Sequence, residues 1–183
     1  MRSWNAIQHA NKLIWLKGSG TTIRLLTNIS LGVITSLLSK MEERCFPISY
    51  TDGLAEIYFT YLKYGLEGDY NSYDCKVRIG CNKKFLDRVH QIFVHEVGHH
   101  IDEQEGFSDL QMLKDEYDTH PGVLSASLGV CFDNDPAGLE GDGRYSEYFA
   151  LGFELFHSHD CGLNKLSYPV LHAIIHEHYK NTK

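Results

Sequence analysis

The pattern of apolar and polar residues divides the first half of the chain into one helix and two strands. Residues 22–44, TIRLLTNISLGVITSLLSKMEER, predict a long helix with a threonine at its start as N-cap. Two later runs, AEIYFTYLKY at 55–64 and CKVRIGC at 75–81, predict strands, and the second alternates apolar with charged positions. The turn-rich stretch GLEGDYNSYD at 65–74 predicts a hairpin between them.

The second half of the chain predicts mostly helices. Gly106 is suited to close the first of them, and the segment DNDPAGLEGDG at 133–143 has the composition of a surface loop. The predicted helices cover residues 84–104, 108–118, 146–157 and 168–180.

This order of elements predicts an α+β fold. An N-terminal helix and a small sheet pack with the helix at 84–104, and a mostly helical C-terminal lobe follows. With 183 residues and 43% hydrophobic content, the chain can bury one sizeable core. We therefore expect a single domain over residues 1–183, with lobes at about 1–105 and 106–183 and a cleft between them.

Charge and composition exclude several classes of protein. A net charge of −7 and a pI near 5.8 argue against a nucleic-acid binder and a polybasic membrane anchor. The first 15 residues are too polar for the core of a signal peptide, and the apolar run at 31–38 is too short to span a membrane. We expect a cytoplasmic monomer without a membrane partner, with export by an unconventional route left open.

The helix at 84–104 carries a motif typical of metal sites. In VHEVGHHID, His95 and His99 lie about 40° apart on one helix face, so both imidazoles can reach one ion. Glu96 lies about 100° round from His95, beside the ion, where a general base that activates water is needed. The alternative is an amphipathic helix with surface histidines.

The rest of this helix favours the metal site. Phe93, Val94, Val97 and Ile101 fall on the arc opposite the two histidines and predict a buried back. Gly98 costs about 1 kcal/mol of helix propensity relative to alanine, which indicates that another element packs close to it.

A catalytic zinc ion needs a third protein ligand, and the segment RYSEYFALGFELFHSHD offers two. Glu147 starts the predicted helix on the side opposite three phenylalanines, and Glu154 returns to within about 20° of the same face. Both carboxylates can therefore look toward one cleft. Its place at the helix start favours Glu147 as the ligand, and Glu154 then fits either a residue that orients a ligand or a surface carboxylate.

Two segments together are similar to a known family. VHEVGHHID, Glu147-Tyr148-Phe149-Ala150 and the following FHSHD resemble the catalytic domain of the anthrax lethal factor-like metallopeptidases, a group that includes the Pro-Pro endopeptidases. The resemblance covers about residues 90–183. It implies a zincin-like fold of the gluzincin type, with His95, His99 and Glu147 as zinc ligands and Glu96 as the base.

The chain departs from this family at one position. The family places a tyrosine a few residues before the ligand glutamate, where its hydroxyl helps to stabilise the oxyanion. Here Tyr145 lies two residues before Glu147, and the loop spacing differs. The resemblance implies that Tyr145 fills this role, and the alternative is a tyrosine that packs at the start of a helix.

Other polar residues have two interpretations each. Asp102 shares the face of His95 and either orients a ligand imidazole or belongs to a solvated helix end. His100 fits a cleft or surface residue. His172 and His176, one turn apart, fit a solvated helix or a second metal site.

The sequence therefore predicts a zinc-dependent endopeptidase that hydrolyses a peptide or protein substrate, which pairs with the strand at 75–81 or a neighbour of it. One alternative is a small intracellular peptidase with the same motif that cleaves a repressor, although such proteins usually keep the third ligand closer to the metal helix. Another is a non-catalytic zinc-dependent binding module. Glu96 argues against the module, because a structural site has no need of an unligated carboxylate.

Overall fold

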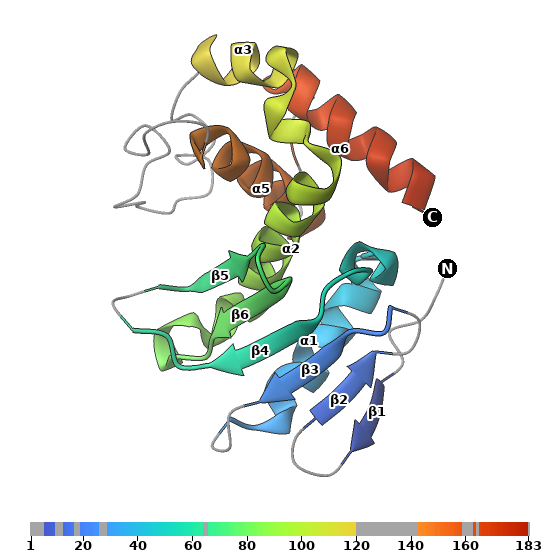
Figure 1. Cartoon of the computed structure of the whole chain (residues 1–183), viewed down its shortest axis with the longest axis vertical. Coiled ribbons are helices and arrows are strands. Elements are labelled where there is room, and N and C mark those ends of the chain that lie inside the picture. Colours follow the sequence, from blue (N-terminus) through green and yellow to red (C-terminus); the bar gives the residue numbers. More distant parts are fainter. Residues whose placement is uncertain are drawn as a thin grey trace.

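A six-stranded sheet and five α-helices make up the described part of the chain (Figure 1). The computed structural model describes residues 6–9, 13–16, 19–25, 29–63, 66–119, 143–158, 163 and 165–182. The strands are β1 (Ala6–His9), β2 (Leu13–Leu16), β3 (Thr22–Leu25), β4 (Glu56–Thr60), β5 (Gly68–Asn71) and β6 (Lys76–Gly80). The mixed α+β class predicted from the sequence is confirmed.

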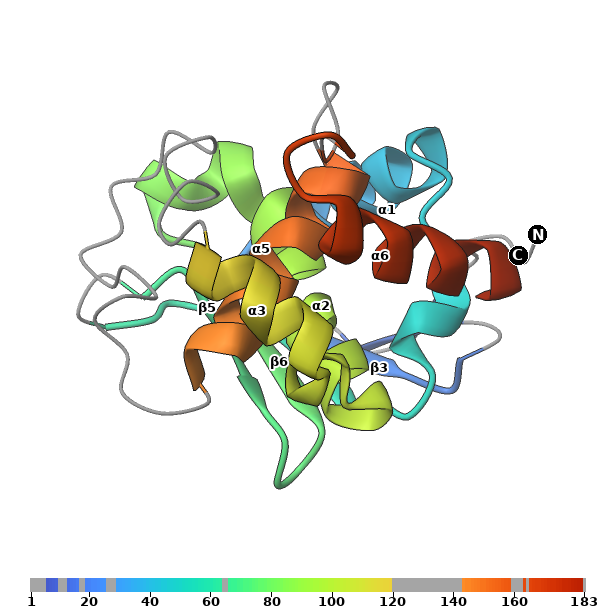
Figure 2. The same cartoon turned by 90° about the horizontal axis from the view of Figure 1, so that it is seen from above.

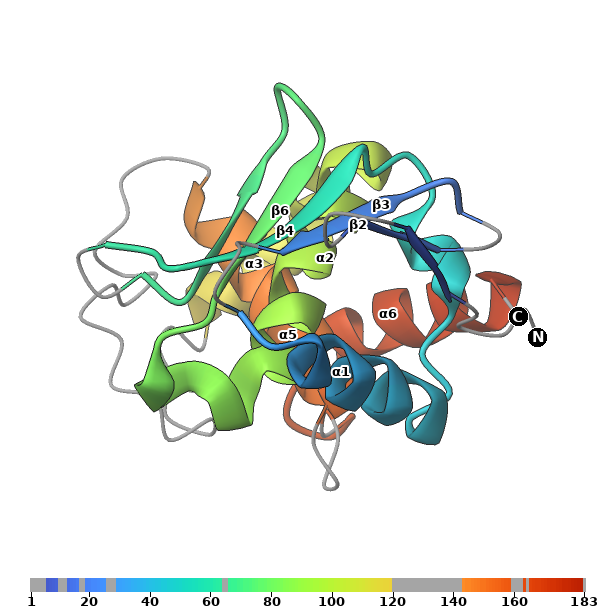
Figure 3. The ribbon, with the colours of Figure 1, turned by 90° about the horizontal axis from the view of Figure 1, so that it is seen from below.

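The helices pack in layers against this sheet. Seen from below, the strands lie to one side, with α1 and α2 next to them (Figure 3). Seen from above, α3, α5 and α6 lie in front of the sheet (Figure 2). The α-helices are α1 (Leu31–Glu43), α2 (Val89–Glu105), α3 (Gln111–Thr119), α5 (Gly143–Ser158) and α6 (Pro169–Thr182), and short 3-10 turns cover Ile48–Thr51, Lys83–Arg88 and Phe107–Asp109. No helix in these residues is long and apolar enough to cross a membrane.

The strand order differs from the predicted hairpin. Neighbouring strands follow the order β1-β2-β3-β4-β6-β5, and β4 runs parallel to β6. The apolar side chains of β4 and β6, such as Ile57, Phe59, Val77 and Ile79, are fully buried, so both strands belong inside the sheet. The polar stretch between them forms β5, which pairs with β6 alone as an edge strand, and the hairpin joins β5 to β6.

The prediction of a helix over 22–44 is wrong in its first part. Thr22–Leu25 forms β3, and α1 begins only at Leu31, capped by the Ser30 hydroxyl, which accepts from the Gly32 amide. Ile23 lies opposite Ile57 of β4 and is buried, so pairing with the sheet outweighs the local helix pattern.

The later helices agree closely with the sequence. The first residues of the stretch at 84–104 form a 3-10 turn, and α2 then continues to its cap at Gly106, which has the left-handed backbone that glycine favours. The predicted loop at 133–143 lies outside the described residues, except for Gly143, the first residue of α5.

Helices α2 and α5 approach each other closely at Gly98, as the sequence predicted. A Cβ atom at this position would lie 3.0 Å from Cα of Ala150 and 3.2 Å from Cβ of Phe153. Two small residues therefore let the helices touch backbone to backbone, which places Glu147, one turn before Ala150, against α2.

Glu116 of α3 holds the start of α6. Its carboxylate accepts hydrogen bonds from the amides of Val170 (2.7 Å) and Leu171 (2.9 Å) and from the hydroxyl of Tyr148 (3.0 Å). The first amides of a helix have no partner within the helix, and the positive end of its dipole favours an anion. The carboxylate thus ties α3, α5 and α6 together.

Replacement of this carboxylate, Glu116→Ala, should lower the free energy of unfolding by about 2–3 kcal/mol, because two helix amides and a hydroxyl lose their acceptor. Urea denaturation measures the change. Glu177→Ala, an exposed position on the same α6 whose partner is Lys180, is the control and should stay within about 0.5 kcal/mol. Equal losses in the two variants would contradict the capping role.

Candidate metal centre

Three predicted ligands converge where α2 meets α5. Nε2 of His95 lies 3.1 Å from Oε2 of Glu147, and Nε2 of His99 lies 3.5 Å from the same oxygen. One ligand atom from each residue lies within 4.8 Å of the other two, and no other group of three histidine, cysteine or acidic side chains in the described ranges is close enough to hold an ion.

The other ring nitrogens have partners on α5. Nδ1 of His95 lies 3.4 Å from Oε2 of Glu154, and Nδ1 of His99 lies 3.1 Å from the Ser146 hydroxyl. A ring that donates through Nδ1 presents the lone pair of Nε2, and outer partners of this kind fix the orientation of metal-binding histidines. Glu147 and Glu154, which share a helix face, thus occupy different places around His95.

The charges at this centre favour either protonated imidazole rings or a bound cation. Oε2 of Glu147 is buried and has no hydrogen-bond partner among the described residues, although two ring nitrogens face it. Two lone pairs and a carboxylate oxygen repel one another unless protons on the rings or a metal ion lie between them. Two imidazoles and one carboxylate are a ligand set that zinc prefers with a fourth position open, so the residues present fit this ion.

The pKa values of His95 and Glu147 are both shifted in the direction that favours a positive charge next to the Glu147 carboxylate. Burial lowers the pKa of His95, but the facing carboxylates of Glu147 and Glu154 and the charge of Glu96 outweigh it and raise the pKa well above its usual value. Burial raises the pKa of Glu147, but His95 and His99 outweigh it and hold the pKa well below its usual range.

Glu96 lies beside this group, as its place on the helix predicted. It is buried, and burial raises the pKa of its carboxyl to about 7; the charges of His95 and His99 oppose the rise, and those of Glu147 and Asp69 add to it. Gly68 of β5 leaves room for the side chain, since a Cβ there would lie 2.6 Å from Oε1 of Glu96. A carboxylate next to a metal site, confined by a strand, can take up a proton from a bound water.

Tyr145 is directed toward α3. Its hydroxyl accepts from Nη2 of Arg144 (2.6 Å) and lies 3.3 Å from Oδ2 of Asp118. Two residues along a helix correspond to about 200°, so Tyr145 and Glu147 project on opposite sides of α5. These contacts favour a tyrosine that packs at a helix start, and the oxyanion role stays a prediction.

Asp102 and His100, which neighbour the predicted ligands on α2, contact other parts of the fold. Oδ1 of Asp102 accepts from the Ser108 amide at 2.7 Å and the residue is buried, so the alternative of a solvated helix end is wrong; the carboxylate next to Nδ1 of His95 is that of Glu154. The prediction of His100 as a cleft or surface residue is wrong, because its side chain is 1% exposed and contacts Asp52 and Tyr70.

The sequence did not predict that Ser146, Gly68 and Tyr70 lie next to residues of the motif helix. Ser146 contacts His99, Gly68 faces Glu96 and Tyr70 contacts His100. Ser146 precedes a predicted ligand, which is a usable signal. Gly68 and Tyr70 lie in a stretch interpreted as a turn, so nothing in the local pattern marked them.

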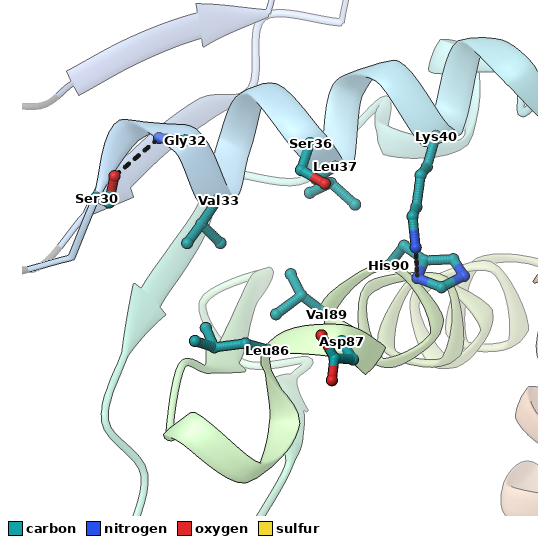
Figure 4. Close-up of a pocket in the computed structure, with 10 residues that line it drawn as sticks. All are labelled: Ser30, Gly32, Val33, Ser36, Leu37, Lys40, Leu86, Asp87, Val89 and His90. Carbon is teal, nitrogen blue, oxygen red and sulfur yellow. Dashed lines mark hydrogen bonds between the residues drawn. The ribbon is translucent and has the colours of Figure 1, made fainter.

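A pocket between α1 and the start of α2 is separate from this centre (Figure 4). Leu37 and Val89 line it, and Nζ of Lys40 lies 3.3 Å from Nδ1 of His90 at one end. It shares no residue with the metal-binding group.

Comparison with known proteins identifies no relative of this chain. No family model, curated protein or solved structure gives a significant match to this chain.

The purified chain should bind about one zinc ion, and the two glutamates should differ in their effect on zinc affinity. Glu154→Ala should weaken binding by about 10- to 100-fold, the usual loss for an outer partner of a ligand histidine. Glu147→Ala should weaken it much further, because a ligand is removed. Zinc titration with a competing chelator dye measures both.

Glu42→Ala, an exposed position on α1, is the control and should bind zinc like the wild type. A stronger loss in Glu154→Ala than in Glu147→Ala would reverse the assignment. A folded wild-type protein that takes up no zinc would refute the site.

Proposed function

We propose that this chain is a zinc-dependent endopeptidase with a zincin-like fold. The observation that carries the proposal is the convergence of Nε2 of His95, Nε2 of His99 and Oε2 of Glu147, with the unligated carboxylate of Glu96 beside them. The resemblance to the lethal factor-like metallopeptidases rests on the same residues and on Tyr148-Phe149-Ala150.

Each residue of the centre has a defined task in peptide hydrolysis. Bound zinc would supply Lewis-acid chemistry, lowering the pKa of a water molecule and polarising the scissile carbonyl. Glu96 accepts the proton of the attacking water and passes it to the leaving amine. Glu154 and Ser146 keep the two imidazoles oriented through Nδ1.

The edge strand β5 supports a peptide as the substrate. β6, the strand considered from the sequence, is paired on both sides, whereas β5 borders only β6 within the described sheet. Gly68 of β5 lies against Glu96, so a peptide added to this edge would pass close to the base.

A zinc-dependent binding module without catalysis is the competing function. It leaves the burial of Glu96 beside the ligands unexplained, since burying a carboxyl group is costly. A peptide-library digest with and without chelator, analysed by mass spectrometry, separates the two: chelator-sensitive cleavage supports the peptidase, and no cleavage by the zinc-loaded chain overturns it.

Glu96→Gln should slow peptide hydrolysis by about 100-fold or more while zinc affinity changes little, because the amide cannot accept the proton and the residue is no ligand. The rate is measured on the best peptide of the library, and zinc content is measured on the same preparation. Unchanged turnover in this variant would refute the mechanism.

Gly68→Ala should also reduce turnover without loss of zinc. The added methyl group would lie 2.6 Å from Oε1 of Glu96 and 2.7 Å from Cγ2 of Ile92, so the base must move. A displacement of about 1 Å can cost 100-fold in rate. Gly143→Ala, where a Cβ meets no atom of the described residues within 4 Å, is the matched control. Equal activity in both variants would show that β5 does not confine Glu96.

A further inference from the structure

Strand β5 lies along helix α2, and two of its residues are spaced like the two residues of α2 that they contact. Gly68 faces Glu96, and Tyr70, two residues on, contacts His100, which is one helix turn beyond Glu96. Two strand residues span about 6.8 Å and four helix residues about 6 Å, so both contacts form in one register. The base and the next turn of its helix are thus each matched to a residue of the edge strand.

His100 connects this strand to the loop after the first 3-10 turn. Its Nε2 lies 2.9 Å from the carbonyl oxygen of Asp52, so Nε2 carries the proton and donates it. Nδ1 is then the acceptor, and the Tyr70 hydroxyl donates to it at 3.2 Å. Gln104, one turn further along α2, donates to the same carbonyl oxygen at 3.2 Å. The chain of hydrogen bonds runs from β5 through α2 to the loop at Asp52.

The residues that face α2 also present their backbone groups to the edge of β5 that no described strand covers. The Gly80 amide donates to the Glu67 carbonyl oxygen at 2.7 Å, which makes this a hydrogen-bonded pair of the antiparallel ladder. Such pairs alternate, so Asp69 bonds to β6, whereas the peptide groups of Gly68 and Tyr70 point away from it. An added peptide strand would bond to Gly68 and Tyr70.

We propose that the hydrogen-bond chain Tyr70–His100–Asp52 is a positioning device that sets the register of the substrate-binding edge against Glu96. The inference rests on the proposed peptidase function. A four-residue strand bonded on one side has little stability of its own, and a slip by one residue moves the edge by about 3.4 Å. The part-buried Tyr70–His100 contact holds the peptide groups that receive substrate at a fixed height along the catalytic helix.

Tyr70→Phe tests the device, because it removes only the hydroxyl that donates to His100. Tyr73→Phe is the matched control: Tyr73 lies in the turn of the same hairpin and is 98% exposed. The expected results for Tyr70→Phe are about tenfold faster hydrogen exchange of the Asp69 amide and about a tenfold higher KM, with a smaller change in kcat and unchanged zinc content. Tyr73→Phe should match the wild type in all of these.

The outcomes separate this proposal from the function it rests on. Hydrogen exchange needs no substrate, so unchanged exchange in Tyr70→Phe overturns the device whether or not the chain cleaves peptides. Faster exchange with unchanged KM shows a structural contact only and also overturns it. Absence of cleavage by the wild type overturns the peptidase function, and with it the substrate part of the proposal.

Discussion

The backbone contact between α2 and α5 at Gly98 is the constraint on which the centre depends. The helices approach so closely there that a Cβ atom on the glycine would lie 3.0 Å from Cα of Ala150. On α5, Glu147 precedes this contact by one turn and Glu154 follows it by one turn, so both reach His95. A bulkier residue at either helix would move every α5 partner of the histidines together, because all of them belong to one rigid helix.

Close packing of the helices creates an electrostatic cost that a cation offsets. Two carboxylates and two imidazoles are gathered in a largely buried space, where unpaired charge is far less favourable than in water. Protons on the imidazoles can neutralise the group, and a zinc ion can do so with better directional bonds. If the proposed zinc ion binds, its binding and the packing of α2 on α5 should therefore strengthen each other.

The sheet contributes to the candidate site through its polar edge strand, β5. β4 and β6 carry the apolar residues and lie inside, which leaves the poorly apolar β5 at the border next to α2. Its composition suits an edge strand, and its glycine lets the strand approach Glu96 without a collision. A sequence that resembles a turn thus forms a strand that lies against the candidate base.

Local periodicity in the sequence determined the α+β class, the end of α2 at Gly106, the extent of α5 and α6, and the shared face of His95 and His99 with Glu96 beside it. These features depend on residues within a few turns of one another. Tertiary structure alone decided the rest: that residues 22–25 join the sheet, that β4 and β6 are parallel, and that Glu147 faces Nε2 of His95 while Glu154 faces Nδ1. The two glutamates lie seven residues apart on one helix face, so the helical pattern treats them alike, and only the position at which α5 crosses α2 distinguishes them.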